Sequence, residues 1–316
     1  MVVNLLNFSD QIMTQSVPDK TLFVIAGPTA SGKTAAAIQL AQHLKTVIVS
    51  ADSRQFYREI SIGTAKPSNE ELSAVPHYFI NSHSITEVVS AGDYEKQALA
   101  LLDQLFKTND EVILVGGSGL FIKAVCEGFD AFPDPTPGIR EQLNQQFEEK
   151  GIEYLQEALK LADPEYYEQV DLNNPQRMIR ALEVFESTGQ PYSSFRKSTL
   201  NSRPFAVKKF GLTLPRDVLY QRINQRVDGM VAQGLIEEVS SLLPSRNLNA
   251  LQTVGYSELF DYFDGKTSLE TAIELIKQNT RRYAKRQMTW FAKDKEIIWL
   301  QAGGGDLVGD MIAEMG

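Results

Sequence analysis

The chain of 316 residues is poor in the residue types that build disulfides, metal sites and membrane spans. Its single cysteine, Cys126, cannot form an internal disulfide, which points to a reducing compartment and predicts a cytoplasmic protein. The three histidines are not spaced as metal ligands and predict no metal site of their own. No apolar run approaches the roughly 18 residues that a membrane span needs, so no membrane association is expected. Residues 1–20 lack the basic start and apolar centre of a signal peptide, and we expect them to form a flexible tail.

The net charge of −9 at pH 7 argues against a broad positive field, yet the charges are unevenly distributed. Residues 196–226 carry eight basic side chains against one acidic, and residues 277–295 carry seven against one. Residues 127–171 carry twelve acidic side chains against three basic ones. Such basic stretches are either solvated helix faces or contacts for an anionic partner such as a nucleic acid, and composition leaves both open.

The most informative stretch is an apolar strand that leads into a glycine-bearing loop and then a helix. We expect the buried strand over Leu22–Ala26 and an alanine-rich helix over Ala35–Leu44. The loop between them fits the pattern G-x-x-x-x-G-K-S/T, whose backbone N–H groups cradle phosphate oxygens. Lys33 is placed to reach the outer phosphate, and the Thr34 hydroxyl to ligate Mg²⁺. A chance glycine turn is the alternative, but the strand–loop–helix context favours a phosphate site. The predicted loop comprises Gly27, Pro28, Thr29, Ala30, Ser31, Gly32, Lys33 and Thr34.

Further apolar segments alternate with helical ones along the chain. This alternation predicts an α/β fold, with a parallel sheet flanked by helices as in P-loop NTPases and with ligands at the carboxyl ends of the strands. The further strands are expected at Thr46–Ser50, His77–Ile80, Glu111–Val115, Val207–Leu214 and, at the sheet edge, Glu296–Leu300. The accompanying helices are expected at Tyr94–Lys107, Arg216–Gln233, Leu235–Leu243 and Leu269–Lys293.

A proline-rich segment, Pro133–Pro137, marks a domain boundary. After it the pattern is purely helical, with helices expected at Arg140–Lys150, Ile152–Leu161 and Pro175–Thr188. We therefore predict a small all-helical insertion over residues 131–196, within a P-loop core formed by residues 21–130 and 197–316.

An ordinary P-loop ATPase needs an acidic residue after an apolar strand to help hold Mg²⁺. The strand that ends at Val115 is followed by Gly116-Gly117-Ser118, and an acidic residue follows the strand before it, at Asp52. This arrangement argues against routine nucleotide hydrolysis. A carboxylate at Asp52 can instead accept a proton from a nucleophile while phosphates leave, with the Ser118 hydroxyl in the same cleft. The alternatives for Asp52 are a helix N-cap or an indirect metal ligand.

Seven segments in this order resemble the bacterial tRNA dimethylallyltransferases, the tRNA isopentenyltransferases of the IPP transferase family. They are GPTASGKT, ADSRQFY, IGTAKP, LVGGSGLF, NPQRMIRALEV, LQTVGY and AKRQMTWF. The first is generic, the next two narrow the resemblance to isopentenyl transferases, and NPQRMIRALEV with AKRQMTWF makes it specific. The resemblance covers the chain from about Phe23 to Leu300.

The resemblance implies transfer of the dimethylallyl group of dimethylallyl diphosphate to N6 of the tRNA adenosine 3′ to the anticodon (A37). Diphosphate is released, and Mg²⁺ is the expected cofactor. In members of this family the P-loop with an arginine matching Arg222 holds the diphosphate, Thr34 would ligate the metal, and residues matching Asp52 and Ser118 are catalytic. No obligate protein partner is expected. The residues that match tRNA contacts are Asp52, Ser53, Arg54, Gln55, Ser118, Arg140, Gln176, Arg177, Met178, Ile179 and Arg180.

The sequence departs from the family pattern at three positions. Ser118 stands where threonine is usual, Phe121 where tyrosine is usual, and Ser257 where lysine or arginine is common. Trp290, in the last basic stretch, is expected to pack in the core. The nearest alternative function is an adenylate isopentenyltransferase that alkylates free AMP, ADP or ATP. A small-molecule kinase and an RNA-binding protein without catalysis are further alternatives.

Overall fold

The computed structural model describes residues 20–130, 132–196 and 202–315. The chain divides into two compact units: residues 1–126 with 203–316 form the core unit, and residues 127–202 form the helical unit. The division lies a few residues outside the boundaries expected from sequence. The expected flexible tail lies, apart from Lys20, outside the described residues.

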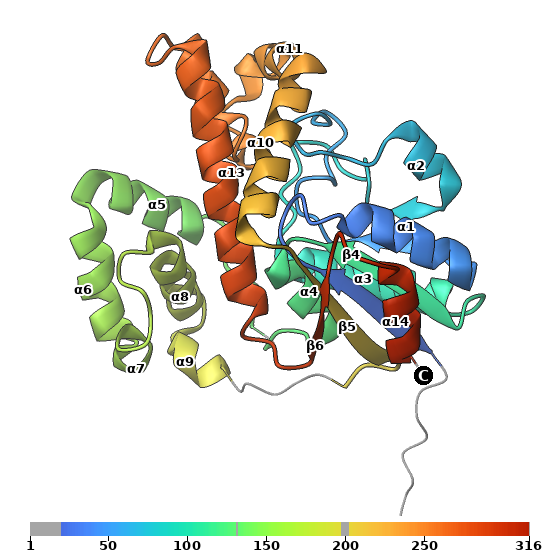
Figure 1. The fold of residues 1–316 in the computed structure, drawn as a ribbon. Helices are drawn as coiled ribbons and strands as arrows, with labels where there is room; N and C mark the ends of the chain where they lie inside the picture. Colours follow the sequence, from blue (N-terminus) through green and yellow to red (C-terminus); the bar gives the residue numbers. More distant parts are fainter. Residues whose placement is uncertain (1–19, 131, 197–201, 316) are drawn as a thin grey trace, which may run out of the picture. The chain divides into compact units, whose positions relative to one another are not determined.

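The core unit is built on a parallel sheet, as the alternating pattern predicts (Figure 1). Within the described residues its strand order is β3-β2-β4-β1-β5-β6. Because β4 lies between β1 and β2, the loops that follow these three strands share one edge of the sheet. Strands β2 and β3 are shorter than expected, and β6 lies at the predicted edge. The strands are β1 Thr21–Ala26, β2 Ile48–Ser50, β3 His77–Tyr78, β4 Glu111–Gly116, β5 Ala206–Thr213 and β6 Ile297–Gln301.

Helices cover both faces of the sheet because alternate residues of each strand point to opposite sides. Leu22 and Val24 of β1 pack with α3 (Ala91–Leu105) and α4 (Gly119–Cys126) on one face. Phe23 and Ile25 pack with α1 (Lys33–Leu44) and α14 (Leu307–Met315) on the other. Sequence analysis missed α14. It also started α3 three residues late, because Ser90 and Asp93 cap the helix reciprocally and let it begin at Ala91.

The two long helices α10 (Arg216–Ala232) and α13 (Leu269–Phe291) run side by side (Figure 1). At one end they enclose an apolar cluster with α11 (Leu235–Ser241) and α12 (Ser257–Phe263), in which Tyr256 is fully buried. At its other end α13 reaches the sheet. Trp290 there departs from the expected core packing: its indole lies against Gly119 but remains 40% exposed. The short helices α2 (Asn69–Ala74) and α12 were not predicted.

The helical unit has its own apolar core, and the three helices predicted for it are confirmed. A one-turn helix follows the second of them and another follows the third, and the buried Asp163 connects these two turns. Its carboxylate accepts hydrogen bonds from the Tyr166 N–H (3.0 Å) and the Ser193 N–H (2.7 Å). In the described part of the chain, no helix is long and apolar enough to span a bilayer. The helices of this unit are α5 Ile139–Lys150, α6 Ile152–Ala162, α7 Pro164–Tyr167, α8 Pro175–Thr188 and α9 Tyr192–Phe195.

Backbone contact between two strand ends holds the loops after β2 and β4 together. The Ala51 N–H donates to the Val115 carbonyl (2.7 Å). A Cβ on the next residue, Gly116, would lie 2.3 Å from the Ala51 carbonyl oxygen, far inside van der Waals contact. Only glycine therefore lets the backbone that leads into Asp52 approach β4 this closely.

We expect Gly116→Ala to lower the free energy of unfolding by about 1–3 kcal/mol, the usual cost of overpacking a rigid site. The clash is with backbone atoms, which no side-chain rotation can relieve. Chemical denaturation measures the effect. Gly304→Ala is the matched control, because a Cβ at Gly304 meets no atom within 4 Å. Equal stabilities of the two variants would show that the strand ends are not in firm contact.

Candidate active site

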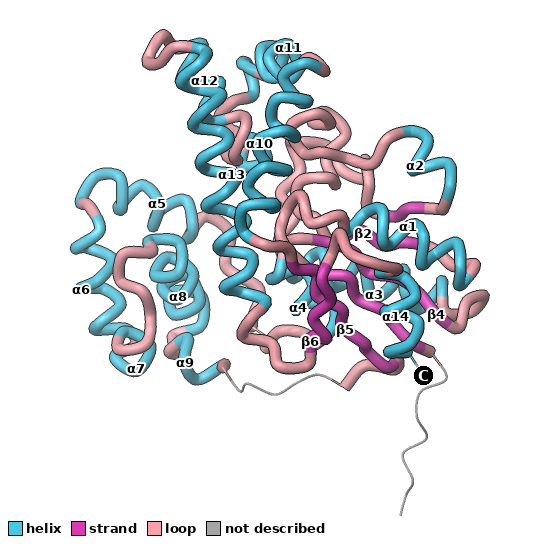
Figure 2. Tube along the Cα trace, viewed as in Figure 1, coloured by secondary structure: helices cyan, strands magenta, loops and turns pink. Residues whose placement is uncertain are grey.

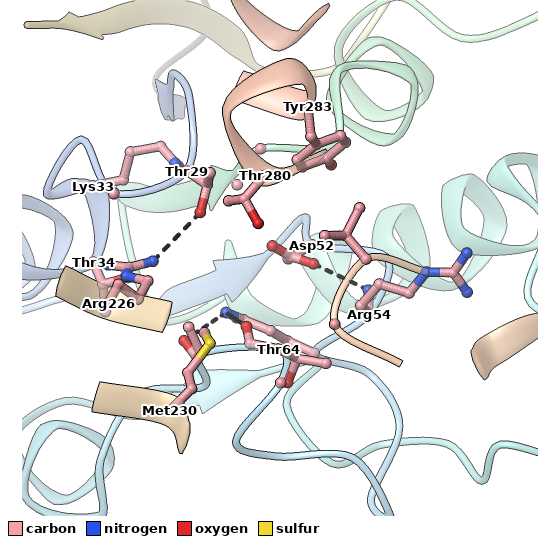
Figure 3. Close-up of a pocket in the computed structure, with 18 of the residues that line it drawn as sticks. Thr29, Lys33, Thr34, Asp52, Arg54, Thr64, Arg226, Met230, Thr280 and Tyr283 are labelled. Atoms are coloured by element: carbon pink, nitrogen blue, oxygen red, sulfur yellow. Dashed lines mark hydrogen bonds between the residues drawn. The ribbon is translucent and has the colours of Figure 1, made fainter. Parts of the chain in front are cut away.

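A cavity of about 400 Å³ opens at the carboxyl edge of the sheet, in the size range of small-molecule sites (Figure 3). Its walls come from the P-loop, from the loops that follow β2 and β4, and from α10 and α13. The chain between β2 and α2, residues 51–68, consists of turns and loop with an isolated bridge at Tyr57, and supplies part of the wall (Figure 2). The cavity thus joins the P-loop to segments from the whole length of the core unit.

Lys33 of the P-loop is held against its own loop in this structure. Its Nζ donates to the Pro28 carbonyl at 2.6 Å. Burial lowers its pKa from the ordinary 10.5 to about 8, although the attraction of Asp52 opposes this shift; the nearby Arg226 cation lowers the pKa further. Close by, the buried Ser31 hydroxyl has no hydrogen-bond partner among the described residues. The loop therefore has a cation and a hydroxyl that a phosphate ligand can satisfy.

Asp52 faces the P-loop across the cavity. One carboxylate oxygen accepts from the Arg54 N–H (3.0 Å) and closes a turn, so Asp52 is not a helix N-cap. Figure 3 shows the other oxygen on the cavity side. The Arg54 guanidinium points away from this carboxylate and donates to the Asn249 and Ala250 carbonyls (3.1 and 3.2 Å). The Asp52 carboxylate is therefore accessible from the cavity.

Gln55 connects two of the sequence motifs. Its Nε2 donates to the carbonyls of Thr64 and Ala65 (3.3 and 3.2 Å), and its Oε1 accepts from the Ser50 hydroxyl at 3.5 Å. The ADSRQFY and IGTAKP segments therefore form one wall, although loop separates them in the sequence.

Glu238 of α11 organises the backbone of this wall and was missed from sequence. Its carboxylate accepts from the N–H groups of Ser61, Ile62 and Gly63 at 2.8–3.0 Å, and from the Tyr256 hydroxyl at 2.6 Å. Burial and the Glu238 carboxylate raise the pKa of Tyr256, which therefore stays a neutral donor. No local sequence signal marks Glu238, because the three backbone N–H groups that it binds are about 175 residues away in the chain.

Ser118 lies behind the cavity wall and supports it. Its hydroxyl accepts from the Ser53 N–H (3.1 Å) and contacts the Ser53 hydroxyl (3.2 Å). It also hydrogen-bonds to Tyr283 of α13, whose ring lines the cavity. Burial, with a further contribution from the Asp52 carboxylate, raises the pKa of Tyr283 from 10.0 to about 12. Sequence analysis did not select Tyr283, which places a neutral phenol beside Asp52.

The arginine on the cavity wall is not the one expected. Arg222 lies next to Gly303, with its Nη2 3.3 Å from where a Cβ on that glycine would be, and does not line the cavity. Arg226, one helical turn later on α10, does line it, and its Nη1 donates to the Thr29 hydroxyl at 3.4 Å. The two arginines share a helix face, which is why sequence alone did not distinguish them.

The residues expected to contact tRNA in the helical unit fall into three environments. Arg140 and Arg180 both bind the buried Glu183 carboxylate, at 2.9–3.1 Å and 2.6 Å. The side chains of Met178 and Ile179 are fully buried in the core of the unit, so they have no route to an RNA. The two that are exposed to solvent are Gln176 and Arg177.

A sequence model of the family described as IPP transferase matches residues 55–294. The chain belongs to the IPP transferase family. A tRNA dimethylallyltransferase of Flavobacterium johnsoniae is 53% identical over 286 residues, which cover 89% of this chain and 93% of the relative. Another from Christiangramia forsetii is 54% identical over 280 residues, with coverage of 89% and 93%.

Solved structures of IPP transferases have the same fold. A tRNA isopentenylpyrophosphate transferase from Bacillus halodurans aligns with a TM-score of 0.68 at 37% identity, over 94% of both chains. A eukaryotic dimethylallyltransferase acting on tRNA aligns with a TM-score of 0.75 at 26% identity, over 90% of this chain and 74% of that one. The α/β fold predicted from sequence is thereby confirmed.

The oxygen donors of this IPP transferase fit Mg²⁺. The described residues contain no group of three His, Cys, Asp or Glu side chains that could hold a metal alone. The cavity instead offers the Thr34 hydroxyl and the Asp52 carboxylate. Magnesium commonly binds through one or two protein oxygens together with substrate phosphates and water. The donor set therefore suits a metal that arrives with a diphosphate.

The lowered pKa of Lys33 predicts a pH-dependent affinity for inorganic diphosphate. Below about pH 8 Lys33 is already protonated, and the affinity advantage of the wild type over Lys33→Ala stays constant. Above that pH, binding must also take up a proton, so the advantage falls by up to about tenfold per pH unit. Calorimetric titration of both proteins with diphosphate and Mg²⁺ measures this, and the ionisation of the ligand cancels in the ratio. An advantage undiminished at pH 9.5 would contradict the lowered pKa.

Proposed function

We propose that this enzyme transfers the dimethylallyl group of dimethylallyl diphosphate to N6 of the adenosine 3′ to the anticodon of tRNA (A37), releasing diphosphate. The observation that supports it is the pairing of a P-loop lysine with a carboxylate across one cavity. Asp52 follows β2, whereas β4, the strand expected to carry an acid in an ATPase, ends in glycines. The relatives named above are tRNA dimethylallyltransferases, which favours tRNA over free AMP as the acceptor.

The cations of the cavity stabilise the leaving group. As the bond between C1 of the donor and the diphosphate oxygen breaks, negative charge grows on the diphosphate. Lys33 and Arg226 are positioned to stabilise that charge, and Arg222, one turn earlier on α10, adds positive charge from outside the cavity wall. Thr34 would hold Mg²⁺ together with the diphosphate, and the metal would add charge neutralisation. The P-loop thus grips the alkyl donor rather than a nucleotide.

Asp52 acts as the base for the acceptor amine. The lone pair of an exocyclic adenine amine is delocalised into the ring, so the amine is a weak nucleophile and placement is decisive. As the N6–C1 bond forms, the N6 proton passes to the Asp52 carboxylate. Tyr283 places a neutral phenol near this carboxylate, and Ser118 holds the adjoining Ser53 backbone by accepting from its N–H.

The adenosine must leave its stacked loop to reach the cavity. Ser53 and Gln55 line the cavity and are proposed to contact the extruded base. The helical unit is proposed to bind the anticodon stem-loop through exposed groups such as Arg177. Arg140 and Arg180 are proposed to support that surface through Glu183.

We expect Asp52→Asn to lower turnover by about 10²–10⁴-fold, the usual contribution of acid–base catalysis, while tRNA binding stays nearly intact. The amide keeps the shape of the carboxylate but cannot accept the proton. Single-turnover transfer of labelled dimethylallyl to tRNA measures the effect. Near-normal turnover in this variant would remove Asp52 from the mechanism. Faster alkylation of AMP than of tRNA by the wild type would overturn the proposed acceptor.

We expect Arg177→Ala to weaken tRNA binding and to make its dependence on salt shallower by about one unit of slope, because one phosphate contact is lost. The KM for the donor should not change. Lys160→Ala, which removes another exposed cation of the helical unit, is the matched control. An impaired donor KM with unchanged tRNA affinity would place Arg177 in the diphosphate site instead.

A further inference from the structure

We propose that Gln287 of α13 is a positioning residue that holds the P-loop in its donor-binding conformation. Its Oε1 accepts from the Thr29 N–H of the P-loop at 2.8 Å. Its Nε2 donates to the Gly117 carbonyl, in the loop after β4, at 2.9 Å. The inference deepens the proposed function, since the ligand of this loop is the diphosphate of that reaction.

The Gln287 side chain connects two loops of the cavity by hydrogen bonds. Gln287 is only 6% exposed, although it lines the cavity together with both of its partners. Both partners are backbone groups of residues that line the cavity. Because Thr29 also accepts a hydrogen bond from Arg226, its position affects where that guanidinium stands. Gln287 therefore acts on the donor through Thr29.

A steric constraint shows that this contact is built into the fold. A Cβ on Gly117 would lie 2.3 Å from the Gln287 Nε2, so the amide reaches the carbonyl only because residue 117 is glycine. Gly117 belongs to the segment LVGGSGLF and Gln287 to the segment AKRQMTWF, so this contact brings the two segments together. A planar amide is the neutral group that presents one donor and one acceptor side by side, as these two partners require.

The geometry also couples the donor and acceptor sides of the cavity. The loop that contains Gly117 continues to Ser118, which holds the Ser53 backbone beside Asp52. One buried amide therefore joins the loop proposed to bind the diphosphate to the loop after β4, and Ser118 of that second loop contacts the loop that presents the proposed base. Losing it removes the side-chain partner of the part-buried Thr29 N–H and of the buried Gly117 carbonyl, so we expect the P-loop to gain alternative conformations.

The test is Gln287→Met in the full chain, a change that keeps the length of the side chain and removes both hydrogen bonds. We expect the Kd for inorganic diphosphate with Mg²⁺ and the KM for dimethylallyl diphosphate to rise about 5- to 100-fold. The Kd for tRNA should remain unchanged. Gln278→Met is the matched control, because Gln278 is an exposed glutamine of the same helix.

A second variant changes the other partner of this contact, Gly117. It keeps the proposal testable if Gln287→Met does not fold. Gly117→Ala leaves the glutamine in place but displaces its amide, and we expect the same donor-specific loss. The two changes should be non-additive in the double variant, since both remove one interaction. Full additivity would overturn the proposal.

A purely structural role gives a different result. In that case Gln287→Met lowers Tm but leaves the diphosphate Kd at the wild-type value, and this outcome overturns the inference. Failure of the proposed function is recognised separately, as a wild type that binds diphosphate but transfers no alkyl group to tRNA. Loss of diphosphate binding in the variants would still support the role of Gln287 in that event.

Discussion

The cavity depends on how closely the backbones at the ends of β2 and β4 approach. Gly116 lies against Ala51 with no room for a side chain, and this contact sets the place from which the Asp52 loop departs. The adjacent Gly117 admits the Gln287 amide in the same way. Close backbone packing is stiff, since only concerted movement of the strands can relieve a clash. A polar cavity can therefore keep its shape although loops form most of its walls.

Electrostatics in the cavity favour an anionic ligand. Three cations, Lys33, Arg54 and Arg226, line the cavity together with two carboxylates, Asp52 and Glu71. Lys33 and Arg226 are the two that contact the P-loop, and burial makes the lysine costly to keep charged. A diphosphate that enters this site places negative charge beside Lys33 and Arg226 and so offsets the cost of burying their charges. The same arrangement leaves a carboxylate available on the opposite wall to take up a proton. The groups proposed to attract the leaving group and the group proposed to accept the proton thus lie on different walls of the cavity.

Several of the basic side chains are paired within the protein. Lys277 of α13 pairs with Asp228 and Glu274, and Arg281 donates to Asn224 at 2.6 Å. In the helical unit, Arg140 and Arg180 bind Glu183. Of these partners only the Glu183 carboxylate is buried, and its two arginines offset part of the cost of removing it from water. A basic stretch in a sequence therefore overstates the positive surface available to a partner.

The sequence by itself determined the order of the strands along the chain, the P-loop, the long helices and the family resemblance. These features are local: periodicity, glycine spacing and contiguous motifs depend on neighbours within one element. It did not reveal Glu238, Arg226, Tyr283 or the role of Gln287. Only the tertiary structure decided those, and it also buried Met178 and Ile179 and moved Arg222 off the cavity wall. The physical reason is that the role of a polar side chain depends on its hydrogen-bond partners, and these can lie far along the chain. Gln287, for example, binds Thr29 across 258 residues.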